Sequence, residues 1–391
     1  MWLGLGLVLS LWATAPRLAA QPSPAPIPMT QELRGVWLTN IDSDVLFSQS
    51  RLSQSLERLK LLNFNTIYPT IWNWGYTLYP SDTARSAIGV ATDPDPGFRQ
   101  RDMLAEAVRY GHQQGLAVIP WFEFGLMAPA DSALVRRHPH WVTQRRNGEQ
   151  IVKEGRYDRV WLNPFHPEVQ QFILQLIGEM VANYAVDGIQ LDDHFGLPVE
   201  LGYDAYTVQL YRKEHGGKKP PANPQDAAWM RWRADKLTQL MAKVFETVKS
   251  RNANCLVALS PNSQDFSYRH YLQDWRTWER SGLVEELILQ VYRDDLLSFA
   301  TELVRPEIVA ARAHIPVGVG ILTGLKDHPV PIAQIQQQVQ IVREKNLAGV
   351  SFFFYETLGD RDADFLELFP NTIERPNLLQ GWHSPKPQPP N

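Results

Sequence analysis

The chain has 391 residues, of which 44% are hydrophobic, and carries a formal net charge of −4 from 38 basic and 42 acidic residues. Such a chain can bury a large core, and its balanced charge, without a long single-sign run, argues against nucleic acid as a partner. Cys255 is the only cysteine, which excludes an intrachain disulfide and a cysteine-based metal site.

The two ends of the chain differ in composition from the middle. Residues 1–20 start with an apolar run and close with Ala19 and Ala20, which predicts an export signal and a place in the periplasm, envelope or extracellular space. No basic residue precedes the apolar run, and Leu18 fits the cleavage pattern poorly, so an uncleaved membrane anchor is the alternative. Proline-rich stretches predict a linker over 21–30 and a tail over 383–391, which leaves 31–382 for one folded domain.

Strand-like and helix-like segments alternate along this domain, which is typical of a parallel sheet with helical crossovers. Amphipathic helices are expected between the strands, for example over Arg101–Gln114 and Val169–Tyr184. No glycine-rich phosphate loop follows the first strand, so a (β/α)8 barrel is favoured over a doubly wound sheet. The eight predicted strands are Leu33–Thr39, Asn65–Ile71, Ala117–Phe124, Gly188–Asp192, Leu256–Leu259, Leu287–Tyr292, Ile315–Ile321 and Gly349–Phe354.

Three connections between a strand and the next helix are long: 72–98, 125–165, and the segment from Phe195 through 215–226. Long loops on the carboxyl face of a barrel commonly build substrate subsites, although plain surface insertions are the alternative. Exposed aromatic rings stack on sugar rings, so these loops predict a groove for an oligosaccharide or polysaccharide. The aromatic residues of the first two loops are Trp72, Trp74, Tyr76, Tyr79, Trp141 and Trp161.

The fourth predicted strand ends in two adjacent carboxylates and an imidazole, Asp192, Asp193 and His194. Alternation along the strand predicts that Ile189 and Leu191 face the helices, which leaves Gln190 and Asp192 facing the barrel mouth. Acids at the carboxyl ends of barrel strands are typically catalytic, so we expect Asp192 to be the central carboxylate of a hydrolase. Asp193 is expected to orient Asp192, to bind a sugar hydroxyl or to cap the next turn.

Glycoside cleavage needs a second carboxyl group, which protonates the leaving oxygen. Four acids at the ends of other strands are candidates: Glu123, Asp294, Asp295 and Glu356. Glu123 and Glu356 lie among aromatic residues, where the pKa of a carboxyl rises and suits a proton donor. Asp295 precedes a helical run, where helix capping is the alternative role. The residues themselves leave this choice open.

Other polar and aromatic side chains near strand ends are expected to contact the substrate, and Arg34 could also hold a carboxylate in register. The predicted substrate-binding residues are Asp193, His194, Gln190, Gln290, Tyr292, Asn262, Trp72, Trp74, Trp121, Tyr355 and Arg34. No cofactor is expected, and the protein is expected to be a monomer that meets a membrane only through an uncleaved N-terminal segment.

The sequence also bears on three other functional classes. A metal-dependent hydrolase could use Asp192, Asp193 and His194 as ligands, but consecutive residues on a straight strand cannot all face one ion, and no His-x-His or His-Glu-x-x-His motif is present. A serine hydrolase would need a Gly-x-Ser-x-Gly elbow, which the sequence lacks. A non-catalytic glycan-binding barrel would keep the aromatic groove without paired acids, and it stays open as the alternative.

Four segments resemble one known family, the glycosyl-hydrolase-like family 10 domain. They are Glu32–Asn40 (ELRGVWLTN), Tyr79–Ser81 (YPS), Val186–Phe195 (VDGIQLDDHF) and Gln290–Tyr292 (QVY), and the resemblance spans residues 31–369. The family consists of exported bacterial (β/α)8 barrels related in outline to retaining glycosidases of the α-galactosidase type.

The resemblance implies an enzyme that cleaves glycans of the cell envelope, with peptidoglycan glycan strands as a plausible substrate. By that analogy Asp192 matches the nucleophile, and the proton donor follows the sixth strand, at Asp294 or Asp295. The chain departs from the family pattern at His194, where tyrosine is frequent, and at Glu123, where a neutral residue is common. Glu123 therefore competes with Asp294 and Asp295 for the role of acid.

Overall fold

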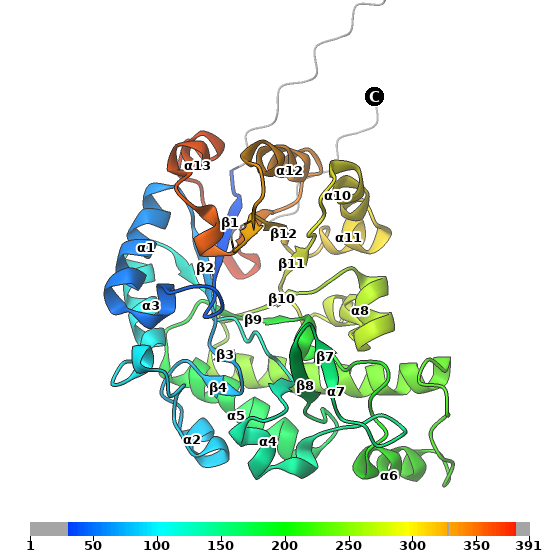
Figure 1. The fold of residues 1–391 in the computed structure, drawn as a ribbon. Coiled ribbons are helices and arrows are strands. Elements are labelled where there is room, and N and C mark those ends of the chain that lie inside the picture. Colours follow the sequence, from blue (N-terminus) through cyan, green and yellow to red (C-terminus); the bar gives the residue numbers. More distant parts are fainter. Residues whose placement is uncertain (1–29, 327, 381–391) are drawn as a thin grey trace, which may run out of the picture. The chain divides into compact units, whose positions relative to one another are not determined.

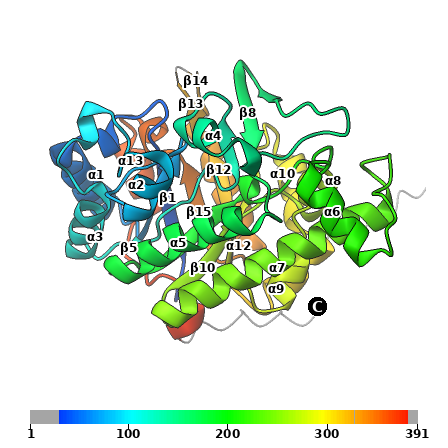
Figure 2. The same cartoon turned by 90° about the horizontal axis from the view of Figure 1, so that it is seen from below.

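The computed structural model describes residues 30–326 and 328–380, and from Gln31 onward these residues form one compact unit. The predicted leader, most of the linker and the tail lie outside the described residues. The unit is built on eight parallel strands in the order β5-β2-β1-β15-β12-β11-β10-β9, surrounded by helices (Figures 1 and 2). The strands are β1 (Leu33–Leu38), β2 (Thr66–Pro69), β5 (Ala117–Val118), β9 (Gly188–Asp192), β10 (Leu256–Ser260), β11 (Glu286–Gln290), β12 (Val317–Leu322) and β15 (Gly349–Phe353).

The two ends of this row of strands meet and close the barrel. The segment after β5 continues as isolated bridges from Trp121 to Thr70 on one side and to Gln190 of β9 on the other. Phe122 N donates to Gln190 O at 2.8 Å, and Gln190 N donates to Pro120 O at 2.8 Å. The predicted strand Ala117–Phe124 is therefore interrupted where Pro120 has no amide hydrogen to give to the ladder. The predicted (β/α)8 barrel is confirmed.

Helices follow the strands as the amphipathic patterns predicted. The segments expected to be helical over 101–114 and 169–184 form α3 (Met103–Gln113) and α5 (Pro167–Asn183). No helix in the described part of the chain is long and apolar enough to cross a membrane. The other α-helices are α1 (Gln49–Leu61), α2 (Asp82–Ile88), α4 (Ala133–Arg137), α6 (Ala205–Glu214), α7 (Ala227–Arg251), α8 (Gln264–Tyr271), α9 (Trp275–Arg280), α10 (Leu296–Leu303), α11 (Pro306–Ala311), α12 (Ile332–Glu344) and α13 (Asp362–Leu368).

Side chains of the barrel strands alternate between two packed layers, as the period of a strand requires. Ile189 and Leu191 belong to the large core between strands and helices, whereas Trp37 and Trp121 belong to a smaller core inside the barrel. Gln190 points inward and accepts a hydrogen bond from Trp37 Nε1 at 2.7 Å. The predicted orientation of β9 is therefore confirmed. Asp192 lies two residues after Gln190, on the same face of the strand and at its carboxyl end.

The long connections build structure on the carboxyl face. The first forms the hairpin of β3 (Trp72–Asn73) and β4 (Tyr76–Thr77), and the second forms a small sheet of β6 (Met127–Pro129), β8 (Tyr157–Trp161) and β7 (Val152–Glu154). A further hairpin joins β13 (Gly324–Leu325) and β14 (His328–Pro329). Short 3-10 helices lie at Val45–Phe47 (η1), Pro96–Phe98 (η2), Pro139–Trp141 (η3), Asp193–Phe195 (η4), Tyr355–Leu358 (η5) and Leu378–Gln380 (η6).

The predicted aromatic groove is wrong for most of its residues. Trp74 and Tyr76 are half-buried, but the other four rings pack into the core rather than toward solvent. Trp72, for example, is fully buried and donates its Nε1 hydrogen to Gly125 O. The physical reason is that these loops are long enough to need a core of their own, and large rings supply it. The buried rings are Trp72, Tyr79, Trp141 and Trp161.

Gly349 allows β15 to pair with β1. It has φ of +134°, and a β-carbon there would lie 2.1 Å from Leu33 O, across the β1–β15 pair. We expect Gly349→Ala to lower the free energy of unfolding by about 3 kcal/mol or more, because the new β-carbon would clash with the backbone of Leu33, which is held in the barrel and cannot move aside. Denaturant unfolding measures this. The matched control is Gly282→Ala, since Gly282 has φ of +69° in open space and should cost only about 1 kcal/mol. Equal losses of unfolding free energy in the two variants would contradict the predicted clash with Leu33.

Candidate active site

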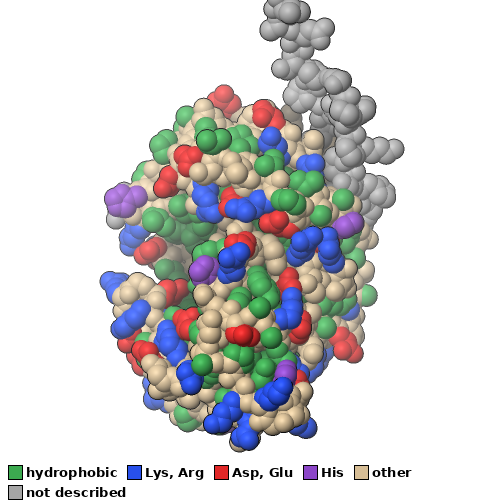
Figure 3. All heavy atoms as spheres, turned by 90° about the vertical axis from the view of Figure 1, so that its right-hand side faces the viewer, with side chains coloured by type: hydrophobic (Ala, Val, Ile, Leu, Met, Phe, Trp, Pro, Cys, Tyr) green, Lys and Arg blue, Asp and Glu red, His purple; other side chains and the backbone are tan. Residues whose placement is uncertain are grey.

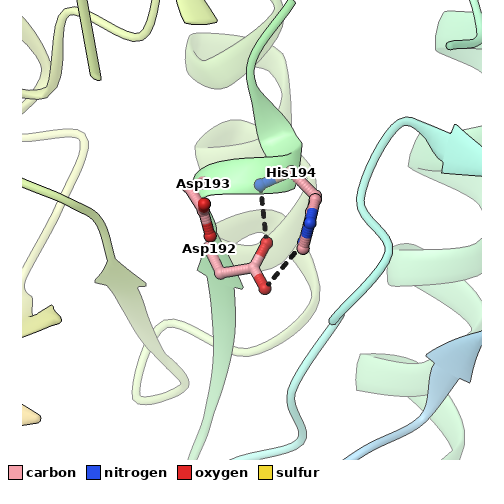
Figure 4. A group of neighbouring side chains, drawn as sticks. All are labelled: Asp192, Asp193 and His194. Carbon is pink, nitrogen blue, oxygen red and sulfur yellow. Dashed lines mark hydrogen bonds and ion pairs between the residues drawn. The ribbon is translucent and has the colours of Figure 1, made fainter. Parts of the chain in front are cut away.

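The candidate site begins where β9 ends. Asp192 closes the strand, and its Oδ1 accepts a hydrogen bond from His194 N at 2.9 Å, which turns the chain into the short helix η4. This turn brings the side chains of Asp192, Asp193 and His194 together, with one polar atom of each within 4.8 Å of the others (Figure 4). A strand that ends in a side-chain cap thus produces a compact cluster from three consecutive residues.

Asp192 is buried at the mouth of the barrel, with a side chain that is 1% exposed. Its Oδ2 accepts a hydrogen bond from Trp121 Nε1 at 3.0 Å, and Gln273 Nε2 donates to its backbone carbonyl at 2.8 Å. Burial raises the pKa of Asp192 to about 6, and the nearby charge of His194 opposes that shift. Asp192 is thus a fixed carboxylate that is mainly ionised at neutral pH.

Glu123 supplies a second carboxyl group next to Asp192. It follows the β5 segment, is 7% exposed, and its Oε2 accepts hydrogen bonds from Thr70 Oγ1 at 2.9 Å and Asn73 Nδ2 at 2.8 Å. Burial raises the pKa of Glu123 to about 8, and the neighbouring charge of Asp192 adds to that shift. Among the four predicted acids, Glu123 therefore combines nearness to Asp192 with a proton retained at neutral pH.

His194 links these two acids. Its Nδ1 lies 2.9 Å from Glu123 O and 3.3 Å from Asp192 Oδ2. A backbone carbonyl only accepts hydrogen bonds, so Nδ1 carries a proton and donates it. Burial lowers the pKa of His194, but the carboxylates of Asp192 and Asp193 outweigh burial, and the pKa is raised well above its usual value. The ring is therefore a cation held among carboxylates.

Glu154 completes the cluster, and sequence reasoning missed it. It lies in β7, and its Oε1 is 3.6 Å from His194 Nε2, while its Oε2 accepts a hydrogen bond from Arg159 Nε at 2.9 Å. The close contact with His194 is the largest cause that lowers the pKa of Glu154 to about 2. The alternation over Tyr157–Trp161 could have predicted the hairpin strand β8, but no local signal shows that the hairpin folds back over β9.

Replacement of Glu154 by glutamine should lower the pKa of His194, because it removes one carboxylate that faces the ring from β7. Asp192 at the end of β9, Asp193 in η4 and the carboxyl of Glu123 remain, so the ring should still titrate above its usual value. An NMR titration of the His194 ring measures the change. Asp158→Asn is the matched control, since Asp158 lies on the same hairpin but pairs with Lys153. An unaltered titration of His194 in Glu154→Gln would contradict the contact between these two side chains.

The structure contradicts one expectation about a metal ion. Consecutive residues were expected to be unable to face one point, but the η4 turn ends the straight strand and brings Asp192, Asp193 and His194 together. The hydrogen bonds supply a different objection. The Nδ1 atom that faces Asp192 carries the proton donated to Glu123 O, and a protonated nitrogen has no lone pair for a metal.

Asp193 anchors the polar edge of the site. Its carboxylate accepts hydrogen bonds from Asn262 Nδ2 at 3.0 Å and from Gln290 Nε2 at 3.2 Å. Burial, and then the nearby charges of Asp193 and Asp192, raise the pKa of Tyr292 well above the usual value. The sequence predicted these residues to share one site from the ends of β9, β10 and β11, and the structure brings them together.

Several predicted site residues lie elsewhere. Arg34 is near the amino end of β1, where its Nε donates to Glu32 Oε2 at 2.7 Å and its Nη1 donates to Asn371 O at 2.6 Å. It is therefore at the opposite end of the barrel from the carboxyl face, and its predicted site role is wrong. Gln190 is fully buried and bonded to Trp37, which keeps it below the site.

The acids after β11 and β15 have other surroundings. Asp295 caps α10 by accepting a hydrogen bond from Ser298 N at 2.8 Å, and Asp294 is exposed beside it. Glu356 accepts a hydrogen bond from Ser43 Oγ, and burial raises its pKa. Glu356 and Tyr355 line a cavity of about 1060 Å³ between the ends of β1 and β15, rather than the cluster around Asp192.

A closed parallel barrel with helical crossovers and long loops on its carboxyl face places the protein in the class of (β/α)8 barrels. The sequence matches the model of the family described as Glycosyl hydrolase-like 10 over residues 32–342. The chain belongs to this glycosyl hydrolase-like 10 family, as the resemblance of its motifs predicted.

Curated relatives include the glycosyl hydrolase DigH of Escherichia coli K12, which is 27% identical over 323 residues covering 71% of this chain and 69% of DigH. The glycosyl hydrolase YngK of Bacillus subtilis is 25% identical over 67% of this chain and 54% of its own length.

Among solved structures, the glycoside hydrolase domain of PgaB from Bordetella bronchiseptica has a TM-score of 0.66 at 13% identity, covering 88% of this chain and 99% of that domain. The β-amylase catalytic domain of Paenibacillus polymyxa has a TM-score of 0.58 at 10% identity, and the match covers 85% of this chain and 94% of that domain. These structural neighbours show a shared fold.

Proposed function

We propose that this protein hydrolyses glycosidic bonds in an exported or cell-envelope glycan, with Asp192 as nucleophile and Glu123 as acid and base. One arrangement carries the proposal: Asp192 Oδ2 and the backbone oxygen of Glu123 both lie within 3.3 Å of His194 Nδ1, and both carboxyls are buried, which raises their pKa values to about 6 and about 8. Near pH 7 the first is mainly ionised and the second mainly protonated. Glycoside hydrolysis requires this division between a nucleophile and a proton donor.

The reaction then proceeds in two balanced steps. Asp192 attacks the anomeric carbon while Glu123 gives its proton to the leaving glycosidic oxygen, so that a glycosyl ester forms and an alcohol leaves. Glu123, now ionised, takes a proton from water, and the water oxygen displaces Asp192 from the sugar. The charged His194 beside Asp192 favours departure of that carboxylate, because it stabilises the anion.

The surroundings suit a sugar substrate. Asp193 is half-buried and is held by Asn262 and Gln290, so its carboxylate is fixed for accepting hydrogen bonds from hydroxyl groups. Asn40 lines the cavity of about 1060 Å³. Its Oδ1 accepts from Asn73 Nδ2, which also donates to Glu123, so this cavity adjoins the proposed acid. Asp192 itself is covered, and a glycan has to displace the side chains over it.

The relatives and the predicted leader support the proposed substrate class. DigH and YngK carry the name glycosyl hydrolase, and PgaB is named for a glycoside hydrolase domain. An exported hydrolase of this kind meets envelope polysaccharide, and peptidoglycan glycan strands are our first candidate. The candidate rests on the predicted export signal in residues 1–20 together with these names.

A panel of purified polysaccharides tests the proposal. Wild-type protein should release new reducing ends from at least one glycan, peptidoglycan glycan strands included, and a chelator should leave the rate unchanged. Loss of activity with chelator would favour the metal-dependent alternative. Binding of a glycan without any cleavage would favour the non-catalytic barrel, and neither binding nor cleavage across the panel would contradict the proposed substrate class.

A further inference from the structure

A second cavity lies on the carboxyl face beside the catalytic cluster. It has a volume of about 420 Å³, and Trp74 of the β3–β4 turn and Tyr157 and Arg159 of β8 are among the residues that line it. The rings of Trp74 and Tyr157 meet edge to face, with centroids 5.1 Å apart and planes at 84°. The cavity therefore has an aromatic wall of the kind that packs against the apolar face of a sugar ring.

Arg159 gives this wall a fixed hydrogen-bond donor. Its side chain is 3% exposed, and its guanidinium carbon lies 4.3 Å from the Trp74 ring centre and 4.8 Å from that of Tyr157. Nε donates to Glu154, but neither terminal nitrogen donates a hydrogen bond to any described residue. Neither terminal nitrogen is among the fully buried unpaired polar atoms of the described residues, so each keeps some accessible surface and can donate to a polar ligand in the cavity that Arg159 lines.

Short contacts tie the cavity to the proposed acid and nucleophile. Asn73 Oδ1 accepts from Trp74 N at 2.7 Å and thereby shapes the turn that holds Trp74 at a φ of +53°, while Asn73 Nδ2 donates to Glu123. On the other side, Glu154 bonds Arg159 and faces His194, the neighbour of Asp192. The cavity and the cluster are thus two parts of one carboxyl face. A hollow containing hydrophobic and acidic side chains is visible at the left-hand edge of Figure 3.

The charges around the cavity balance. Two arginines, Arg156 and Arg159, and two acids, Asp131 and Asp158, line the cavity, so its lining carries no formal net charge. A ligand that offers both hydroxyl groups and an apolar ring face fits this lining better than an anion does.

We propose that this cavity is an outer subsite for a neutral pyranose ring of the same glycan chain whose bond is cleaved at Asp192. This inference rests on the proposed function and extends it. Trp74 and Tyr157 pack against the ring, and the terminal nitrogens of Arg159 donate to its hydroxyl oxygens. The protein then acts on long chains, because a substrate that fills both sites gains binding energy that a short one lacks.

The test uses Trp74→Ala, with Trp74→Phe as the variant that keeps a ring, and oligosaccharides of increasing length. We expect kcat/KM for long chains to fall about tenfold in Trp74→Ala. The value for the shortest cleaved substrate should change little, and Trp74→Phe should recover most of the loss. Tyr206→Ala is the matched control, because Tyr206 is 36% exposed on α6, close to the 37% of Tyr157, but lies outside the cavity.

A binding measurement separates this inference from the hydrolytic proposal. Calorimetry of wild type and Trp74→Ala with long chains reports the subsite even if no substrate is cleaved, and weaker binding in the variant supports it. The inference is overturned if Trp74→Ala lowers kcat/KM equally for short and long substrates, if it lowers neither, or if no chain binds the wild type. Thermal unfolding of each variant excludes a folding defect as the cause of a loss.

Discussion

Asp192→Asn should abolish turnover and leave the protein folded. Removal of an attacking carboxylate typically costs more than about a thousandfold in kcat. Asparagine has the size of aspartate and keeps one oxygen to accept from Trp121 or His194. The lost hydrogen bond is offset because the variant no longer buries an ionised group in a site that raises its pKa to about 6. Reducing-end release and near-ultraviolet circular dichroism measure the two outcomes.

The matched control is Asp187→Asn. Asp187 precedes the same strand at its amino end, where it pairs with His112 at 2.9 Å, so turnover should persist in that variant. In Asp192→Gly, where removal of the side chain leaves room for a small anion, azide should restore cleavage by attacking the anomeric carbon in place of the carboxylate, which a merely structural role would not allow. Near-wild-type activity in Asp192→Asn would remove the assignment of Asp192 as nucleophile.

The barrel and the centre of its site could be predicted because the signals are local. Apolar runs and their spacing give the strands, and the period of two along β9 sends Asp192 into the mouth and Leu191 to the helices. The ends of parallel strands then meet on one face, which is why Asn262, Gln290 and Asp193 were expected together and lie together.

The remainder of the site depends on the positions that the long loops adopt over the barrel, and no local sequence pattern predicts those positions. Glu154 reaches His194 only because the β7–β8 hairpin returns over β9. The same loops turn Trp72 and Trp161 inward, so counting rings overestimates the exposed groove. Arg34 fails for a different reason, since it precedes the carboxyl end of β1 by several residues and its guanidinium reaches the acid Glu32 beneath the barrel.

The choice among the candidate acids is likewise a matter of environment. Glu123, Asp295 and Glu356 all follow barrel strands, but Asp295 caps α10 and Glu356 bonds Ser43. Only their surroundings distinguish a helix cap from a proton donor. Burial is the largest cause that raises the pKa of Glu123, whereas the backbone hydrogen bond from Ser298 lowers the pKa of Asp295. The position of each acid at a strand end was predictable, and its role was not.

Glu123→Gln should remove the proton donor and with it one limb of the pH profile. In wild type, activity should rise as pH increases through about 6, where Asp192 ionises, and fall as pH increases through about 8, where Glu123 loses its proton. Glutamine keeps an oxygen for Thr70 and Asn73 but has no acidic proton. We expect turnover of natural glycans to fall by about 10² to 10⁴, and the limb near pH 8 to disappear.

The substrate used distinguishes a missing proton from a distorted site. Aryl glycosides with good leaving groups need little protonation, so they should lose much less activity in Glu123→Gln than natural glycans do. Glu356→Gln is the matched control, because Glu356 also has a pKa raised by burial but lies against Ser43, and it should retain the limb near pH 8. A limb near pH 8 that persists in Glu123→Gln would transfer the proton-donor role to another group. Its disappearance in Glu123→Gln but not in Glu356→Gln would tie that role to the carboxyl that lies beside Asp192.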